Sequence, residues 1–144
     1  MQKVDIMFFD FDGTIADTGQ DLVASVNHTL ASLRLPAKTH KEIISFVGDG
    51  VRTLLERALG DAGRENLDEA LTIFSRHYEQ HMLDQTVLCP NVEAVLKYFQ
   101  HKMKVIVTNK RHHLTKAIAR GLHIDKYFME MVGADSTPYL KPDR

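Results

Sequence analysis

A helical block separates the first predicted strand from all later ones, and this order limits the possible folds of the chain more than any other feature. Residues 4–9 form a short, mostly apolar run of bulky side chains, which is typical of a buried strand. Over residues 17–84 apolar side chains recur at helical spacing, enough for four helices. After Pro90 helices and strands alternate, which predicts a parallel sheet with right-handed crossovers. The sequence therefore predicts an α/β core, residues 1–16 and 85–144, interrupted by a helical domain, residues 17–84.

Local signals mark the ends of individual elements. In the helical block, Thr39 followed by Glu42 predicts a capping box, and Gly60 is expected to end the next helix. In the core, Asn91 is placed to cap a helix. The elements expected after it are a strand over residues 103–107, a helix over residues 114–120 stopped by Gly121, and a strand over residues 129–134. Three strands make a thin sheet for this architecture, so we expect the chain to be a fragment.

Composition excludes several classes of function. Lys and Arg number 18 and Asp and Glu number 19, and no run of like charge stands out, so nonspecific nucleic-acid binding is not expected. Acidic residues interrupt the first apolar run too early for a signal peptide, and no stretch is long enough to cross a bilayer, so we expect a cytoplasmic protein without a membrane partner. The single cysteine, Cys89, cannot form an internal disulfide, and we expect it to be a small core residue.

Two carboxylates directly follow the first predicted strand. In Asp10-Phe11-Asp12-Gly13-Thr14 the acids are two residues apart, so in an extended backbone they point the same way, roughly 6 to 7 Å apart. Parallel α/β sheets bind ligands at the carboxyl ends of their strands, where this pair lies. Gly13 permits a tight turn that leaves backbone amides free to face an anion. Taken alone, the motif favours a plain acidic turn, and a calcium loop would need oxygen ligands that the following residues do not supply.

Polar groups follow the other two predicted strands as well. Thr108 and Asn109 come directly after residues 103–107, where hydroxyl and backbone N–H donors can hold phosphoryl oxygens. Lys141 lies in a proline-flanked loop after the third strand. Each has an ordinary explanation, because Thr and Asn often cap helices and most loop lysines are solvated. Three such groups after three successive strands nevertheless favour one shared site.

These residues resemble the motifs of the haloacid dehalogenase (HAD) superfamily phosphatases, and the resemblance covers essentially the whole chain. Residues 10–18 resemble the first motif, Thr108-Asn109-Lys110 the second and Lys141-Pro142 the third. The helical block is similar to the small α-helical cap of the phosphoglycolate phosphatase-like subgroup, and residues 88–96 resemble its re-entry into the core, with Asn91 where the family has Gly. The resemblance implies a Rossmann-like HAD core with an inserted helical cap.

The family implies a role for each site residue. Asp10 would be the nucleophile that forms an aspartyl-phosphate, and Asp12 the general acid and base. Thr108 and the amide of Asn109 would hold phosphoryl oxygens, while Lys141 would neutralise charge on Asp10 and the phosphate. Mg²⁺ would bind the Asp10 carboxylate and the main-chain carbonyl of Asp12. The other residues assigned to substrate binding are Gly13, Thr14 and the cap-loop residues Gly48, Asp49, Gly50 and Arg52.

Within the cap loop, Arg52 is available for a substrate carboxylate. The simpler alternative is that Asp49 caps the next helix and Arg52 is solvated. His77 and His81 have the i, i+4 spacing of a metal pair, but no third ligand is evident, so we expect a helix surface there.

One departure from the family concerns the metal. The family carries a further acidic motif after the third, with the remaining metal ligands, and this chain stops at Arg144. We expect the chain alone to be inactive or weakly active, with an open sheet edge that favours association. The oligomeric state expected is monomer or homodimer.

The leading hypothesis is a Mg²⁺-dependent phosphatase for a small phosphorylated metabolite, with 2-phosphoglycolate the best single substrate. The alternatives are a pyrophosphatase or phosphosugar mutase of the same superfamily, or a non-catalytic phosphate-binding fragment without a complete metal site.

Overall fold

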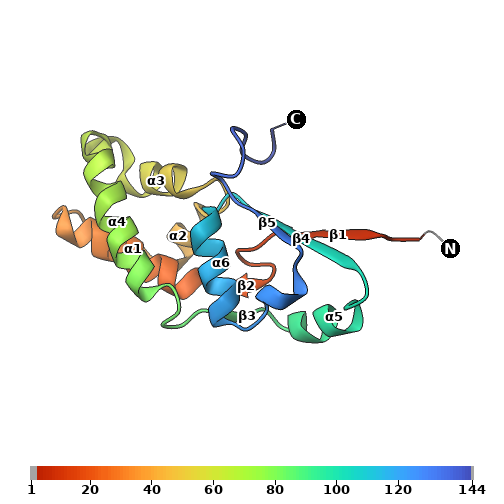
Figure 1. Cartoon of the computed structure of the whole chain (residues 1–144). Helices are drawn as coiled ribbons and strands as arrows, with labels where there is room; N and C mark the ends of the chain where they lie inside the picture. Colours follow the sequence, from red (N-terminus) through yellow and green to blue (C-terminus); the bar gives the residue numbers. More distant parts are fainter. Residues whose placement is uncertain (1–2, 144) are drawn as a thin grey trace. The chain divides into compact units, whose positions relative to one another are not determined.

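Two separate units make up the chain in the computed structural model, which describes residues 3–143 (Figure 1). One unit joins Met1–Asp17 to Val87–Arg144, and the other is Thr18–Thr86. These divisions lie one and two residues from the boundaries expected from the sequence. Among residues 3–143, no helix is both long and apolar enough to cross a membrane.

A three-stranded parallel sheet forms the centre of the first unit, in the order β1-β4-β5. The strands are β1 (Ile6–Phe9), β4 (Met103–Val107) and β5 (Glu130–Val132). The prediction for the central strand, β4, is confirmed at both ends. This strand lies between β1 and β5, and its apolar residues Val105 and Ile106 are buried. The outer strands are shorter than predicted. β1 begins only at Ile6 because its partner there, Met103, is the first residue of β4.

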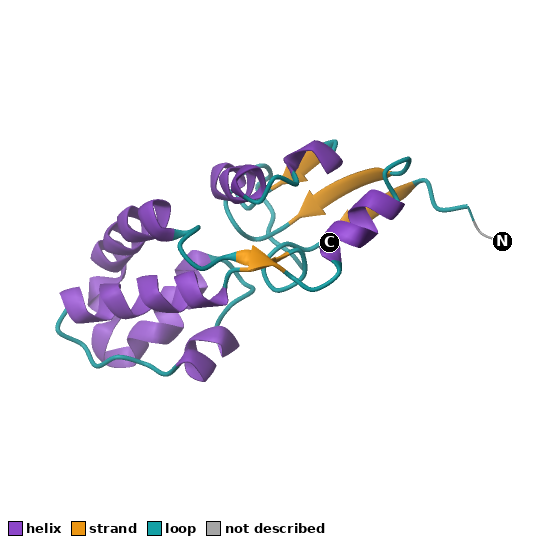
Figure 2. Cartoon of the chain, turned by 90° about the horizontal axis from the view of Figure 1, so that it is seen from below, coloured by secondary structure: helices purple, strands orange, loops and turns teal. Residues whose placement is uncertain are grey.

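Short helices lie between the strands of this unit along the chain, and helices are drawn in purple in Figure 2. They are α5 (Val92–Tyr98), α6 (His112–Gly121) and the 3₁₀ turn η2 (Asp125–Tyr127). The helix expected after Asn91 is present, but the prediction that the Asn91 side chain caps it is wrong. Asn91 has a left-handed backbone, φ 64°, and no side-chain cap bond. Asn is among the few residues that tolerate this conformation, which explains how it stands where the family has Gly.

The chain leaves the first unit and returns to it through a small antiparallel pair, β2 (Ala16–Asp17) and β3 (Val87–Leu88). Cys89 lies directly after this pair, and its N–H donates to the Ile15 carbonyl. It is only partly buried rather than a core residue, and that burial raises the pKa of its thiol.

Four α-helices form the second unit, as expected from the periodicity. They are α1 (Gly19–Ser32), α2 (His40–Ser45), α3 (Val51–Gly63) and α4 (Leu67–His81), with the 3₁₀ turn η1 (Arg64–Asn66) before the last. The capping box of Thr39 and Glu42 is confirmed. Gly60 ends the first helical stretch of α3, as predicted: its backbone is not helical, φ 63° and ψ −168°, and a second short helical stretch follows it to Gly63. Apolar side chains such as Val26, Leu55 and Tyr78 are almost fully buried between these helices.

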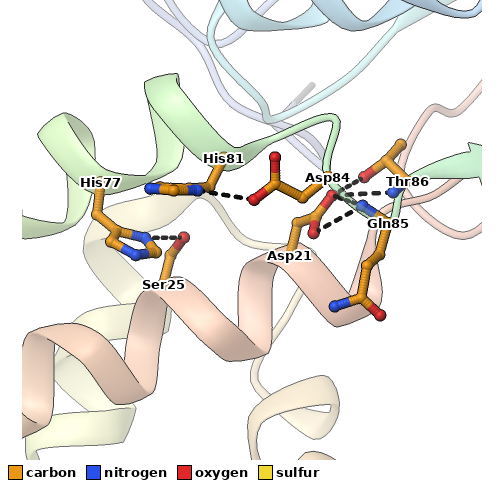
Figure 3. Close-up of polar contacts among 7 residues, drawn as sticks. All are labelled: Asp21, Ser25, His77, His81, Asp84, Gln85 and Thr86. Atoms are coloured by element: carbon orange, nitrogen blue, oxygen red, sulfur yellow. Dashed lines mark hydrogen bonds and ion pairs between the residues drawn. The ribbon is translucent and has the colours of Figure 1, made fainter.

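A buried acid ties the end of the helical unit to its beginning (Figure 3). Asp21, in the first turn of α1, is 2% exposed and accepts hydrogen bonds from the N–H groups of Gln85 and Thr86. The Thr86 hydroxyl donates a further bond of 2.8 Å to the same carboxylate. Among residues 3–143 no buried side-chain nitrogen or oxygen lacks a hydrogen-bond partner, so the Asp21 carboxylate is a satisfied structural anchor.

Three histidines stack in the same unit. The His77 ring lies between those of His28 and His81, with centroids 4.1 and 4.3 Å away. Its Nδ1 is 2.9 Å from the Ser25 hydroxyl, and His81 Nδ1 is 2.7 Å from an Asp84 carboxylate oxygen (Figure 3). The expectation of a plain helix surface is therefore wrong for His77, which packs against α1.

Candidate active site

Asp10, Thr108 and Lys141 follow the three parallel strands in turn. Asp10 directly follows β1, Thr108 directly follows β4, and Lys141 lies in the loop after β5. Parallel strands bring their carboxyl ends to one edge of the sheet. Residues that are up to 131 positions apart thus meet at one place.

Lys141 reaches Asp10. Its Nζ lies 3.0 Å from Asp10 Oδ1, and the same oxygen accepts the N–H of Phe11 at 2.8 Å. The two side chains are 39% and 53% exposed. The carboxylate is held in one orientation, with a cation beside it, and remains open to a ligand from solvent.

Asp12 has a lysine of its own. Lys110 Nζ is 3.1 Å from Asp12 Oδ1, and the side chains are only 6% and 17% exposed. No role for Lys110 was predicted from the sequence. The available signal was its place as the last residue of the second motif, where a cation can neutralise one of two acids held close together.

Thr108 is 4% exposed and fixed by backbone bonds. Its N–H donates to the Val132 carbonyl, and its hydroxyl oxygen accepts the N–H of Lys110 at 3.1 Å. The Asn109 side chain turns to Lys141: its Nδ2 donates to the Lys141 carbonyl at 3.0 Å, and its Oδ1 accepts the Lys141 N–H at 2.8 Å. The loop after β4 is thus bonded to the loop after β5.

The turn after Asp12 differs from expectation. Gly13 has φ 75°, the tight turn that was predicted. However, its N–H donates to the Ala16 carbonyl, and that of Thr14 donates to the Phe11 carbonyl. The prediction that this turn leaves those amides free for an anion is therefore wrong, because the turn uses them itself. Substrate binding by Gly13 and Thr14 cannot rest on these two donors.

The four cap-loop residues Gly48, Asp49, Gly50 and Arg52 all belong to the helical unit. Asp49 does not cap α3, whose N-cap is Gly50; instead it forms an ion pair of 2.7 Å with Arg57. Arg52 is 63% exposed and lies 3.5 Å from Glu56. The Arg52 guanidinium also lies 4.0 Å from an Asp68 carboxylate oxygen, so it sits at the surface of the helical unit with two loosely paired acidic neighbours.

Asp10 and Asp12 offer the oxygen donors that suit Mg²⁺. This ion is usually held by one or two carboxylates, several waters and substrate phosphate. Within residues 3–143, no group of three or more His, Cys, Asp or Glu side chains could hold a metal ion. The donors at this site thus fit a magnesium ion that takes much of its coordination from water and phosphate.

Comparison with known proteins identifies the family. The family model of the haloacid dehalogenase-like hydrolases matches residues 7–144. This chain belongs to the haloacid dehalogenase-like hydrolase family. Among its HAD relatives is the phosphoglycolate phosphatase of Colwellia psychrerythraea, 35% identical over 99% of the chain. Another is the phosphoglycolate phosphatase of Aquifex aeolicus, 32% identical over 95% of the chain.

Solved structures of HAD proteins share the fold. A predicted phosphoglycolate phosphatase from Haemophilus somnus superposes with a TM-score of 0.89 at 28% identity, over 96% of this chain and 65% of that one. The chain covers 67% of the Colwellia relative and 64% of the Aquifex relative. It therefore spans about two thirds of the length of these HAD relatives.

Proposed function

We propose that this chain carries the catalytic core of a Mg²⁺-dependent phosphatase that hydrolyses a small phosphorylated metabolite. The observation that carries the proposal is the contact between Asp10 and Lys141, 3.0 Å apart at the carboxyl edge of the sheet. A half-exposed carboxylate with a cation beside it can approach a phosphate dianion, because the cation offsets the repulsion between them. The relatives named phosphoglycolate phosphatase support the same class of reaction.

In the proposed reaction, a carboxylate oxygen of Asp10 attacks phosphorus while the bond from phosphorus to the leaving oxygen breaks. Since Oδ1 already accepts two N–H groups, we assign the attack to Oδ2. Asp12 gives a proton to the leaving oxygen. It then takes a proton from the water that hydrolyses the aspartyl-phosphate, which releases inorganic phosphate and restores both acids.

Three donors of this chain would stabilise the negative charge on the transferring phosphoryl group. Lys141 neutralises the phosphoryl group and Asp10, while the Thr108 hydroxyl and the Asn109 backbone N–H bind phosphoryl oxygens. Mg²⁺, held by Asp10 and Asp12, would supply further positive charge between the phosphate and the nucleophile. Positioning and charge are the main contributions that phosphoryl transfer needs from a protein.

We take 2-phosphoglycolate as the first substrate to test, with Arg52 as the group for its carboxylate. A pyrophosphatase or a phosphosugar mutase would use the same core chemistry with another acceptor or leaving group. A non-catalytic phosphate-binding module is the second candidate, and the small number of candidate metal donors in residues 3–143 favours it.

The test is phosphate release from 2-phosphoglycolate and p-nitrophenyl phosphate by the purified chain, with Mg²⁺ or with EDTA. We expect turnover that requires Mg²⁺ and falls at least about 10³-fold in Asp10→Asn, since removal of a nucleophile has effects of this size or larger. Asp5→Asn is the matched control, because Asp5 is an exposed acid paired only loosely with Lys3, 3.8 Å away. It should leave the rate unchanged.

The outcomes separate the two candidates. Saturable phosphate binding without turnover would identify a binding module. Turnover that survives Asp10→Asn would contradict the proposed nucleophile, and turnover in EDTA would contradict the metal.

A further inference from the structure

The Asn109 carboxamide forms a two-bond clamp on the backbone of Lys141. Nδ2 donates to the Lys141 carbonyl at 3.0 Å and Oδ1 accepts the Lys141 N–H at 2.8 Å. A primary amide can donate and accept at once, so it pairs with a peptide unit as a neighbouring strand would. Both ends of the clamp are partly buried, which makes its bonds harder to replace with water.

The loop that carries Lys141 has little other support close by. Its flanking residues, Tyr139, Leu140 and Pro142, are exposed. The loop is bonded to other segments near its start, where Asp135 accepts the His112 N–H and the Ala134 N–H donates to the Lys110 carbonyl. From Thr137 onward the neighbouring hydrogen bonds are local: Thr137 bonds with Tyr139, and the Asp143 N–H donates to the Leu140 carbonyl. The Asn109 clamp, in contrast, spans 32 positions and joins this loop to the end of the central strand.

We infer that the Asn109 side chain is a positioning residue that holds Lys141 where its Nζ reaches Asp10. The inference rests on the proposed function for its catalytic consequence, but the clamp itself is a structural claim. Asn109 thus has two separable roles. Its backbone N–H is assigned to the phosphoryl group, whereas its side chain acts only through Lys141, so a side-chain substitution leaves the backbone donor in place.

The helical unit contains a matched control. Asn27 clamps Lys38 in the same way, with Nδ2 to the Lys38 carbonyl at 2.9 Å and the Lys38 N–H to Oδ1 at 2.9 Å. The asparagines and lysines of both clamps are partly buried. Asn27→Ala therefore removes the same two hydrogen bonds from a residue outside the proposed site.

The first experiment measures how fast each lysine is acetylated by a trace of acetic anhydride, read by peptide mass spectrometry. In Asn109→Ala we expect Lys141 to react about tenfold faster, the size of effect that loss of one or two hydrogen bonds produces, with Lys38 unchanged. Asn27→Ala should leave Lys141 unchanged. Asn109→Asp is a second variant of the same size, which loses the donor to the Lys141 carbonyl and covers the case in which alanine prevents folding.

This labelling needs no turnover, so it tests whether Asn109 positions Lys141 even if the chain is inactive. An unchanged Lys141 rate in folded Asn109→Ala or Asn109→Asp would overturn the inference.

The second experiment is a double-mutant cycle on phosphate release. Asn109→Ala should lower kcat about 10- to 100-fold, since small displacements of a positioned group have effects of this size. In the Lys141→Ala background, Asn109→Ala should lower kcat no further, because the Asn109 side chain acts only through the lysine that is already absent. A full additional loss in that background would overturn the inference. Absence of turnover in the wild-type chain would instead count against the proposed function, and the labelling result would stand on its own.

Discussion

Each acid of the candidate site has its own lysine, and the two pairs differ in exposure. The Asp12–Lys110 pair is nearly buried, whereas the Asp10–Lys141 pair is about half exposed. A buried pair fixes geometry, since breaking it leaves a charge in a poorly solvated place. An exposed pair separates more easily, because water solvates both charges. The difference agrees with the proposed roles, in which Asp10 attacks the phosphate and Asp12 must be held in a fixed position to exchange protons with the leaving oxygen and with water.

Lys110→Met tests the buried pair. We expect it to lower the free energy of unfolding by about 3 kcal/mol, because it leaves the Asp12 carboxylate without this cation. Urea denaturation followed by circular dichroism measures the change. Adding Asp12→Asn to Lys110→Met should recover part of the loss.

Lys97→Met is the control, since Lys97 and Glu93 form a pair of 2.7 Å with both side chains about 60% exposed. It should lower the free energy of unfolding far less than Lys110→Met does, because water screens an exposed pair. Equal losses in the two lysine variants would contradict a structural role for the buried pair.

Arg52→Ala tests the cap-loop assignment. If Arg52 binds a substrate carboxylate, its loss should raise KM for 2-phosphoglycolate by about tenfold and leave KM for p-nitrophenyl phosphate, which has no carboxylate, unchanged. Steady-state kinetics with the two substrates measures the difference. Arg57→Ala is not a suitable control because Arg57 holds Asp49. Arg76→Ala, in the middle of α4, serves better, and an equal rise for both substrates would contradict the assignment.

At the scale of elements, the histidine stack makes the packing of α1 against α4 sensitive to pH. Burial lowers the pKa of His77, and the neighbouring His28 and His81 lower it further, while Asp84 acts in the opposite direction. In the unfolded chain the pKa returns to about 6.5. Just below that value the unfolded state binds more protons than the folded one, so stability is lost as pH falls.

We therefore expect the free energy of unfolding of the helical unit to fall between about pH 7.5 and about pH 5.5, above the range in which most carboxylates titrate. His77→Gln removes the titrating group and should flatten this dependence, although it lowers stability at the higher pH by removing the stack. Urea titrations of both proteins at the two pH values measure the effect. Parallel pH profiles for wild type and variant would show that another group is responsible.

Elements with a strong local signal could be predicted from the sequence, and those set by partners could not. The strand at Met103–Val107 and the capping box at Thr39 depend on residues close in the chain. The start of β1 depends on the register with β4, which no local pattern contains. In contrast, Gly60 has the non-helical backbone that its local signal predicted, and a second short helical stretch follows it to Gly63.

The candidate site divides in the same way. Asp10, Thr108 and Lys141 could be found because their motifs lie next to predicted strands. The Lys110–Asp12 pair and the Asn109 clamp could not, since each joins loops whose meeting depends on the tertiary fold. The same holds for Asp21, whose partners are 64 and 65 positions away.

At the scale of the whole molecule, the helical unit has a core of its own. Buried apolar residues from α1, α3 and α4 pack within Thr18–Thr86. We predict that residues 18–86, expressed alone, give a helical circular dichroism spectrum and a cooperative thermal transition. Asp21→Ala should weaken that transition, because it leaves the N–H groups of Gln85 and Thr86 without their acceptor. A featureless spectrum of the isolated segment would show that the unit depends on the rest of the chain.

The anchor at Asp21 also bears on how such a protein can change over generations. The first turn of α1 and the last residues before β3 are bonded to one carboxylate, so the helical unit begins and ends at almost the same point. Segments with adjacent ends can be inserted into a host, or exchanged, with little disturbance to the strands on either side. Recombination could therefore replace the helical unit as one segment, while the candidate site residues that follow β1, β4 and β5 stay unchanged.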